Sequence, residues 1–221
     1  MLTAPDIPIQ ESPLKGGESY YGILVWFVDI GTHETTYMNE RKFTRQCVMT
    51  FEFPELLIKD GDTGEESPMV RSMRLTFSMA STANLRKHIE KWYGKQFETD
   101  EDALRFDFEY ILGKSAMCDI MLSKKGNPYI DAIRKAPKAE KSPYNPLIIW
   151  GFSTGEEIPS ALPDWMKKLI MESREWNEGE GQRGYKEEQY EYERTEKLRQ
   201  EHEPDFGEQY STVGEPDDVP F

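Results

Sequence analysis

A continuous run of strand-forming residues near the start of the chain limits its possible folds most strongly. Residues 20–30, YYGILVWFVDI, are rich in β-branched and aromatic side chains and show no helical period. Apolar side chains occupy both parities of the run, so both faces of this strand are expected to be covered, at least in part. Such a strand fits the wall of a barrel, in which Gly22 would permit a bend.

Two later segments alternate as strands with one buried face. In residues 43–53, one parity is predicted to face the core: Cys47, Met49, Phe51 and Phe53. Pro54 is expected to end this strand, and the polar stretch 33–42 before it is expected to be a loop. Residues 70–78 alternate in the same way, with outward-facing residues Ser72, Arg74 and Thr76.

The next elements are predicted from capping residues and apolar spacing. Ser81 or Thr82 is expected to cap a helix that Gly94 ends, and a short helix is expected to begin at Thr99. Two strands follow at 115–123 and 129–134, joined by a tight turn. Three strands, a helix and two strands form the element order of an OB-fold, so the predicted fold is mainly β with α: a five-stranded barrel with a helix between strands three and four.

The chain is predicted to have four parts. Residues 1–18 read as a loose arm, 19–140 as the barrel domain, 141–176 as an added segment, and 177–221 as a disordered acidic tail. The added segment has an apolar stripe at helical spacing: Leu162, Trp165, Met166, Leu169, Ile170 and Trp176. It is expected to pack on its own domain, with self-association, and hence a homo-oligomer, as the alternative. Residues 183–203 would form a transient helix through charge pairs.

The charge is divided unevenly along the chain. The formal net charge is -14, and residues 151–221 hold 8 Lys and Arg against 19 Asp and Glu. Residues 1–150 hold 19 against 22. A nearly neutral body with an acidic tail fits a nucleic-acid binder whose tail competes with the ligand, and it equally fits an acidic protein that stays soluble. No membrane-spanning run or signal peptide is visible, so a cytosolic location is expected.

The last residues of the chain have the character of a peptide ligand. In residues 215–221, EPDDVPF, the acids Glu215, Asp217 and Asp218 precede the apolar end Val219, Pro220 and Phe221. This end resembles the C-terminal tip of bacterial single-stranded-DNA-binding proteins, which has several acids followed by Ile-Pro-Phe; Val219 stands for the Ile. The resemblance implies that the tip recruits replication, recombination and repair proteins.

A second resemblance covers roughly residues 20–140. The segment Asn84-Leu85-Arg86-Lys87, together with Trp92, Phe97, Phe106-Asp107 and Leu112-Gly113-Lys114, is similar to a family of bacteriophage-encoded single-stranded-DNA-binding or replication proteins. This resemblance implies a role in phage replication or recombination in the bacterial host cytoplasm.

Single-stranded DNA needs cations for its phosphates and flat rings for its bases. On an OB-fold, strands two and three and the loops joining strands one to two and four to five form the usual binding surface. The predicted DNA-binding residues at these places are Tyr37, Arg41, Lys42, Phe43, Thr44, Gln46, Arg74, Lys124, Lys125 and Tyr129.

Catalysis is not expected. The chain has no nucleophile motif and no phosphate-binding glycine loop, so neither catalytic residues nor cofactors are predicted. Cys47 and Cys118 are expected to be buried free thiols, without His residues spaced for a metal site. Two rivals to DNA binding stay open. One is an acidic interaction protein or DNA mimic that occupies basic sites on host enzymes, and the other is a metal-dependent nuclease that uses acids such as Asp60 and Asp62.

Overall fold

The computed structural model describes residues 12–37, 40–59, 64–136 and 142–178. The chain divides into two compact units, 1–181 and 182–221. All described residues belong to the first unit, and the following account concerns that unit alone.

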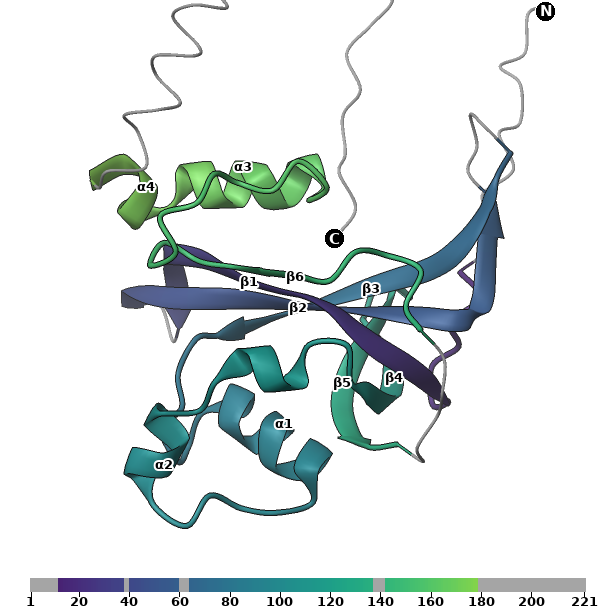
Figure 1. The fold of residues 1–221 in the computed structure, drawn as a ribbon, viewed down its shortest axis with the longest axis horizontal. Helices are drawn as coiled ribbons and strands as arrows, with labels where there is room; N and C mark the ends of the chain where they lie inside the picture. Colours follow the sequence, from purple (N-terminus) through teal and green to yellow (C-terminus); the bar gives the residue numbers. More distant parts are fainter. Residues whose placement is uncertain (1–11, 38–39, 60–63, 137–141, 179–221) are drawn as a thin grey trace, which may run out of the picture. The chain divides into compact units, whose positions relative to one another are not determined.

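Six strands form one sheet (Figure 1). They are β1 (Ser19–Tyr37), β2 (Glu40–Lys59), β3 (Glu66–Thr76), β4 (Ser115–Leu122), β5 (Pro128–Lys135) and β6 (Ile148–Trp150). The order is β3-β2-β1-β4-β5 with antiparallel neighbours, and β6 adds to β1 in parallel. The mainly β prediction is confirmed. The predicted closed barrel is not: within the described residues no ladder joins β3 to β5, so the sheet stays open.

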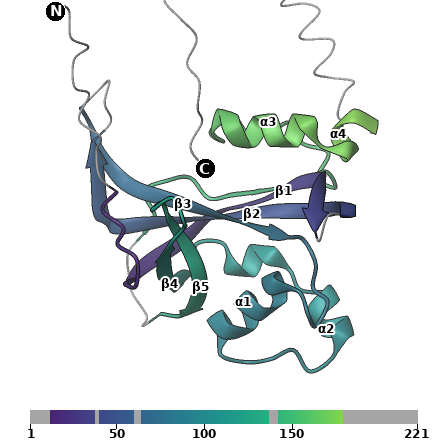
Figure 2. The ribbon, with the colours of Figure 1, turned by 180° about the vertical axis from the view of Figure 1, so that it is seen from behind.

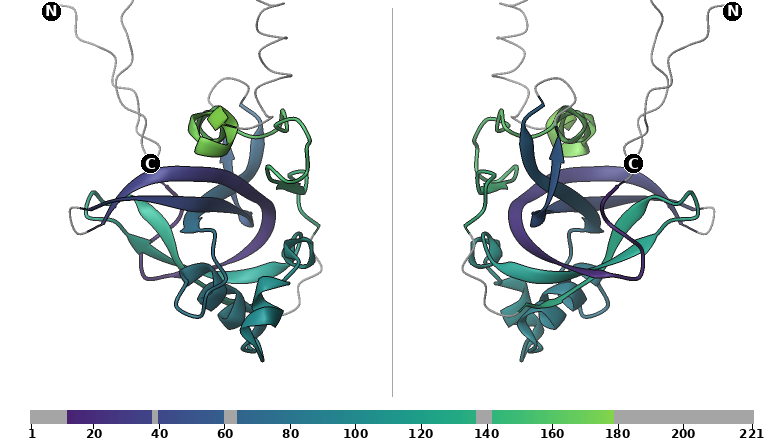
Figure 3. Two further views of the ribbon diagram at one scale, coloured as in Figure 1. Left: turned by 90° about the vertical axis from the view of Figure 1, so that its left-hand side faces the viewer. Right: turned by 90° about the vertical axis from the view of Figure 1, so that its right-hand side faces the viewer.

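The helices lie on both sides of this sheet. They are α1 (Asn84–Tyr93), α2 (Asp100–Leu104), the 3₁₀ turn η1 (Phe108–Ile111), α3 (Asp164–Glu172) and α4 (Arg174–Glu178). In Figures 1 and 2, α1 and α2 lie below the long strands and α3 lies above them. Figure 3 shows that the strands curve strongly around the side that holds α1 and α2.

Two apolar cores follow from this arrangement. The larger core fills the curved side of the sheet, where Cys47, Met49, Phe51 and Phe53 point inward with α1 beneath them, as the alternation of β2 predicts. The smaller core lies between the other face of β1 and β2 and the helix α3, and it includes Val48. The first strand is therefore covered on both faces, but α3 covers the second face.

Local chemistry explains the ends of the helices. Gly94 ends α1 in the left-handed conformation, at φ 67°, as predicted. Thr99 caps α2, and its hydroxyl oxygen accepts a hydrogen bond from the Asp102 amide at 3.0 Å. The predicted start of α1 at Ser81 or Thr82 is wrong, because the helix begins at Asn84 after Ala83, whose side chain makes no cap.

Three predicted boundaries need correction. Residues 33–42 are not simply a loop, because cross-strand pairing from His33–Thr44 to Tyr37–Glu40 extends the β1–β2 hairpin through most of them. Pro54 does not end β2; the strand continues to Lys59 past a register shift between Phe53 and Leu57. Leu14 is 3% exposed and lies in the larger core, so packed structure begins before residue 19.

Residues 142–178, which we call the covering segment, are joined to the sheet by polar contacts. The buried carboxylate of Glu52 accepts hydrogen bonds from the amides of Tyr144 and Asn145 at 2.8–3.1 Å. The indole of Trp26 donates to the Pro146 carbonyl at 3.1 Å. Near α4, both carboxylate oxygens of Glu175 accept from Thr32 at 2.6 Å. The apolar stripe therefore packs on its own unit, with Trp165 left 41% exposed.

Both cysteine thiols are free and buried, as predicted. Burial raises the pKa of the Cys47 and Cys118 thiols, so neither forms a thiolate readily. Among the described helices, none has the length and apolar character needed to span a membrane.

Candidate nucleic-acid interface

The outer end of the β1–β2 hairpin divides the predicted residues between its two faces. Side chains alternate along a strand, so Lys42 and Thr44 share one face of β2, while Arg41 and Phe43 share the other. The Thr44 hydroxyl lies 2.9 Å from the Thr35 hydroxyl on the neighbouring strand. For Tyr37 only the backbone is described, and it pairs with Glu40. These residues do not form one surface.

The cations of this hairpin have acidic neighbours. The Arg41 guanidinium lies 3.1 Å from Glu34, and the Lys42 ammonium lies 3.8 Å from Glu40. Phe43 is 66% exposed and lies opposite Glu34. Phosphate binding here would have to compete with carboxylates that already hold the positive charges.

The outward parity of β2 is covered at the centre of the strand. Gln46, Val48, Thr50 and Glu52 are all buried. Gln46 is 8% exposed, and its amide oxygen accepts a hydrogen bond from the Arg74 guanidinium on β3. The prediction that Gln46 lies on an open surface is therefore wrong. α3 and residues 142–147 occupy the space that was expected to receive DNA.

The β4–β5 hairpin is open to solvent. Lys124 and Lys125 are exposed in its turn, which is closed by a 2.8 Å hydrogen bond from the Ser123 amide to the Asn127 carbonyl. Met121 and Tyr129 are cross-strand partners on its outward face, and they are 46% and 41% exposed. An exposed ring beside two lysines is the combination that single-stranded DNA requires.

Arg71 connects the two edge strands of the open sheet. Its guanidinium, on β3, donates to the carbonyl of Pro128, the first residue of β5. Burial lowers the pKa of Arg71, and within the described residues no carboxylate is paired with it. Burial also lowers the pKa of Arg74, but Arg74 lies three positions further along β3, so its side chain is on the opposite face, where it donates to Gln46. We call the group of residues at this junction the seam surface: Arg71, Met121, Lys124, Lys125 and Tyr129.

The two predicted clusters are far apart along the sheet. The turn of the β4–β5 hairpin lies beside the beginning of β1, where the Gly17 amide donates to the Ile120 carbonyl at 2.7 Å. The β1–β2 turn lies at the other end of β1, which is 19 residues long. At a normal strand rise this is about 60 Å along the strand. The structure thus places Lys124, Lys125 and Tyr129 on the β4–β5 hairpin, Arg74 beside Gln46, and the remaining predicted residues at the β1–β2 hairpin.

Sequence reasoning missed two residues of the seam surface. Arg71 lies between Met69 and Met73 on the parity of β3 that faces the core. An arginine at such a position was the available signal that this strand passes an opening or an edge. Met121 gave no signal of its own, because a methionine in a strand is typical of a core.

Within the residues that the structure describes, no group of three or more His, Cys, Asp and Glu side chains is placed to hold a metal ion. The predicted partner-binding residues Asp217, Asp218, Val219, Pro220 and Phe221 lie outside the described part of the chain. No family model, curated protein or solved structure matches this chain.

Proposed function

We propose that this chain binds single-stranded DNA without sequence preference and without a catalytic step, along the seam surface. The observation that carries the proposal is the position of Arg71: a partly buried guanidinium that no carboxylate of the described residues pairs with, next to the strand that presents Tyr129. A phosphate would supply the anion that this guanidinium lacks.

The other side chains of the seam surface supply the remaining contacts. Lys124 and Lys125 would follow the backbone as point charges, and Tyr129 would stack on one base at roughly 1–3 kcal/mol. Neither type of contact reads the edge of a base, so the binding tolerates any sequence. The exposed thioether of Met121 widens the apolar surface beneath that base.

The topology supports this assignment. In this proposal the chain is an OB-type barrel that stays open between β3 and β5, which the strand order and the helix between β3 and β4 support. In this proposal the covering segment takes the face of β2 that such barrels use, and DNA is displaced towards the opening. The tip Asp217–Phe221 would recruit replication and recombination proteins, which suits a phage-encoded protein acting in a bacterial host.

The test is a titration of the full chain into fluorescently labelled oligo-dT at 50 and 200 mM salt, read by anisotropy. We expect saturable binding that weakens with salt, because bound cations displace counterions from the phosphates. Absence of binding at both concentrations would overturn the proposal and favour the alternative of an acidic interaction protein or DNA mimic.

The same titration separates a nuclease from a binder. With Mg²⁺ added, a binder leaves the oligonucleotide intact, and gel electrophoresis recovers it at full length. Shortening of the oligonucleotide that a chelator stops would show metal-dependent cleavage, and the non-enzymatic proposal would then fail.

A further inference from the structure

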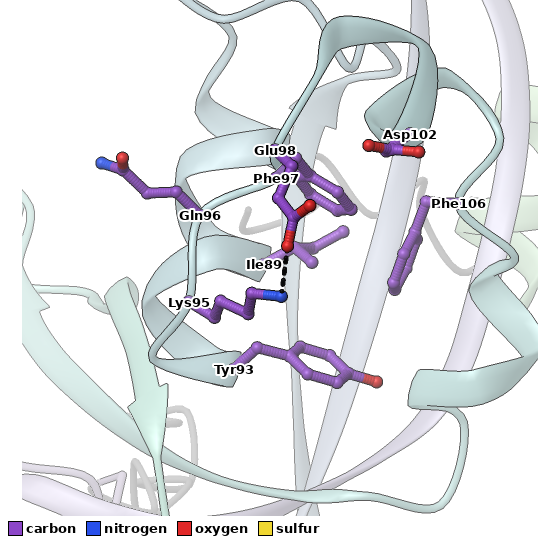
Figure 4. Close-up of a pocket in the computed structure, with 8 residues that line it drawn as sticks. All are labelled: Ile89, Tyr93, Lys95, Gln96, Phe97, Glu98, Asp102 and Phe106. Atoms are coloured by element: carbon purple, nitrogen blue, oxygen red, sulfur yellow. Dashed lines mark hydrogen bonds and ion pairs between the residues drawn. The ribbon is translucent and has the colours of Figure 1, made fainter.

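An aromatic pocket opens between α1 and α2 (Figure 4). Both helices lie on the side of the sheet opposite α3 (Figure 1). Its volume is about 380 Å³. The lining residues come from α1, from the loop after it and from the region of α2, and none of them belongs to the seam surface: Ile89, Tyr93, Lys95, Gln96, Phe97, Glu98, Asp102 and Phe106.

The walls of the pocket are flat apolar side chains. The rings of Phe97 and Phe106 meet edge to face with centroids 5.5 Å apart, and those of Tyr93 and Phe106 do so at 6.0 Å. Ile89 is 1% exposed and closes the inner side. Tyr93 is 46% exposed at the mouth of the pocket. Edge-to-face walls of this kind favour a further aromatic ring as the occupant.

The supporting residues hold the pocket in place. Arg86 is 7% exposed, and its guanidinium donates to Glu90 at 2.9 Å and to Asp100 at 2.5 Å. Its central carbon lies 5.6 Å from the centre of the Phe97 ring, which it fixes from behind. The pocket is therefore formed before any partner arrives, and an occupant loses little free energy to ordering its walls.

Residues 84–109, which include every residue that lines the pocket, carry seven carboxylates against five Lys and Arg side chains, and the acidic excess lies after α1. Residues 98–109 carry six carboxylates against the single cation Arg105, and the six are Glu98, Asp100, Glu101, Asp102, Asp107 and Glu109. The only cation that lines the pocket, Lys95, is paired with Glu98 at 2.9 Å, as the dashed line in Figure 4 shows. A positively charged partner is therefore favoured, and a negatively charged one is repelled.

We propose that this pocket docks a basic segment of a partner protein, which inserts one aromatic side chain between Phe97, Phe106 and Tyr93. The cations on either side of that ring would pair with Glu98 and Asp102. The end of this chain also offers an aromatic residue, Phe221, but Asp217 and Asp218 accompany it, so its charge opposes the rim.

The experiment uses the full-length chain labelled with ¹⁵N and three peptides. The first is Lys-Lys-Phe-Lys-Lys, the second is Glu-Glu-Phe-Glu-Glu, both with blocked ends, and the third is the chain's own tip, residues 215–221. We expect the basic peptide to shift the amide signals of residues 89–106 saturably and at least about tenfold more tightly than either acidic peptide, because only it complements the rim.

Matched variants distinguish binding in the pocket from non-specific attraction of the basic peptide to acidic residues. Tyr93→Ala should weaken the basic peptide about fivefold through loss of one wall. The control Tyr110→Ala removes a ring that is 68% exposed and does not line the pocket, so it should leave the dissociation constant unchanged. Glu98→Gln should weaken binding about threefold, whereas Glu109→Gln, also outside the lining, should have less effect.

Two results would overturn the proposal. The first is that the basic peptide shifts amide signals outside residues 89–106 and still does so in Tyr93→Ala. The peptide would then bind acidic residues elsewhere on the chain. The other is equal or tighter binding of the tip peptide, which would make the chain's own end the occupant. Neither result bears on the seam surface, so this test and the oligo-dT titration fail separately.

Discussion

The outward faces of β2 and of the β4–β5 hairpin differ in what covers them. On β2, the four consecutive outward positions from Gln46 to Glu52 are buried beneath the covering segment. On the hairpin, the outward partners Met121 and Tyr129 are close to half exposed. Strand alternation predicts which side chains point outward on β2 and on the β4–β5 hairpin. Whether those side chains stay exposed depends on the covering segment, which lies far from β2 along the chain.

Both surfaces belong to one sheet, so residues far along the chain, and not the strand order, decide which of them is covered. Residues 142–178 cover the centre of β1 and β2 and leave the opening between β3 and β5 free. We therefore expect the covered face to contribute to stability and the open hairpin to contribute to binding. The following predictions test that division, beginning with the largest effect.

The same substitution should have different effects on the two faces. Met166 on α3 is 0% exposed in the smaller core, and Met166→Ala should lower the free energy of unfolding by about 3 kcal/mol, because it removes buried apolar area and leaves a cavity. Met121→Ala on the open hairpin should cost less than about 1 kcal/mol. Urea denaturation measures both, and equal losses would show that the two faces are equally packed.

The buried carboxylate of Glu52 tests how the covering segment is held. Glu52→Gln places an amide NH₂ group where the amides of Tyr144 and Asn145 need acceptors, so the free energy of unfolding should fall by about 2 kcal/mol. The control Glu101→Gln alters an exposed carboxylate in the first turn of α2 and should cost about 0.5 kcal/mol or less. Urea denaturation measures both variants. Equal free energies of unfolding would show that Glu52 does not hold the covering segment on the sheet.

On the open face, the ring of Tyr129 should matter for DNA and little for the fold. Tyr129→Ala should weaken oligo-dT binding by about 1–2 kcal/mol, or about tenfold in the dissociation constant, because one stacked base is lost. Tyr144→Ala removes a ring that is 68% exposed on the covering segment and should leave binding unchanged. Anisotropy titrations measure both variants, and a larger effect at Tyr144 would move the interface to the covered face.

The smallest expected effect is on the salt dependence of DNA binding, which should depend more on Lys124 and Lys125 than on Arg41 and Lys42. The double variant Lys124→Gln/Lys125→Gln should reduce the slope of log K against log salt by about 1.4, since each phosphate contact to a single strand contributes about 0.7. Arg41→Gln/Lys42→Gln removes cations that lie beside Glu34 and Glu40, and the slope should change by less. A larger change in slope for Arg41→Gln/Lys42→Gln would indicate that the DNA binds at the β1–β2 hairpin.

Features set by neighbouring residues could be predicted from the sequence. Thr99 caps α2 and Gly94 ends α1 through contacts within a few positions. The core parity of β2 follows from its own alternation, and both thiols are buried because they lie on strand faces that point inward. Each of these predictions depends on residues that lie close together along the chain.

Features that depend on residues far apart along the chain could not be predicted from the sequence. Glu52 lies on an outward parity and looks like a solvent-facing acid, yet amides more than 90 positions later bury it. Residues 33–37 form a strand because they pair with residues 40–44 across the hairpin, although the polar composition of 33–42 suggests a loop. For Arg71, the core-facing position was visible in the sequence, but its contact across the sheet opening was not.

Ultraviolet crosslinking of the full chain to oligo-dT, with the crosslinked peptides identified by mass spectrometry, tests the seam surface most directly. The account predicts that crosslinks concentrate on the β4–β5 hairpin, with Tyr129 as the main site, and that Tyr129→Ala removes them. Crosslinks that concentrate on Phe43, Tyr144 or Trp165 and leave the hairpin unmodified would contradict the account.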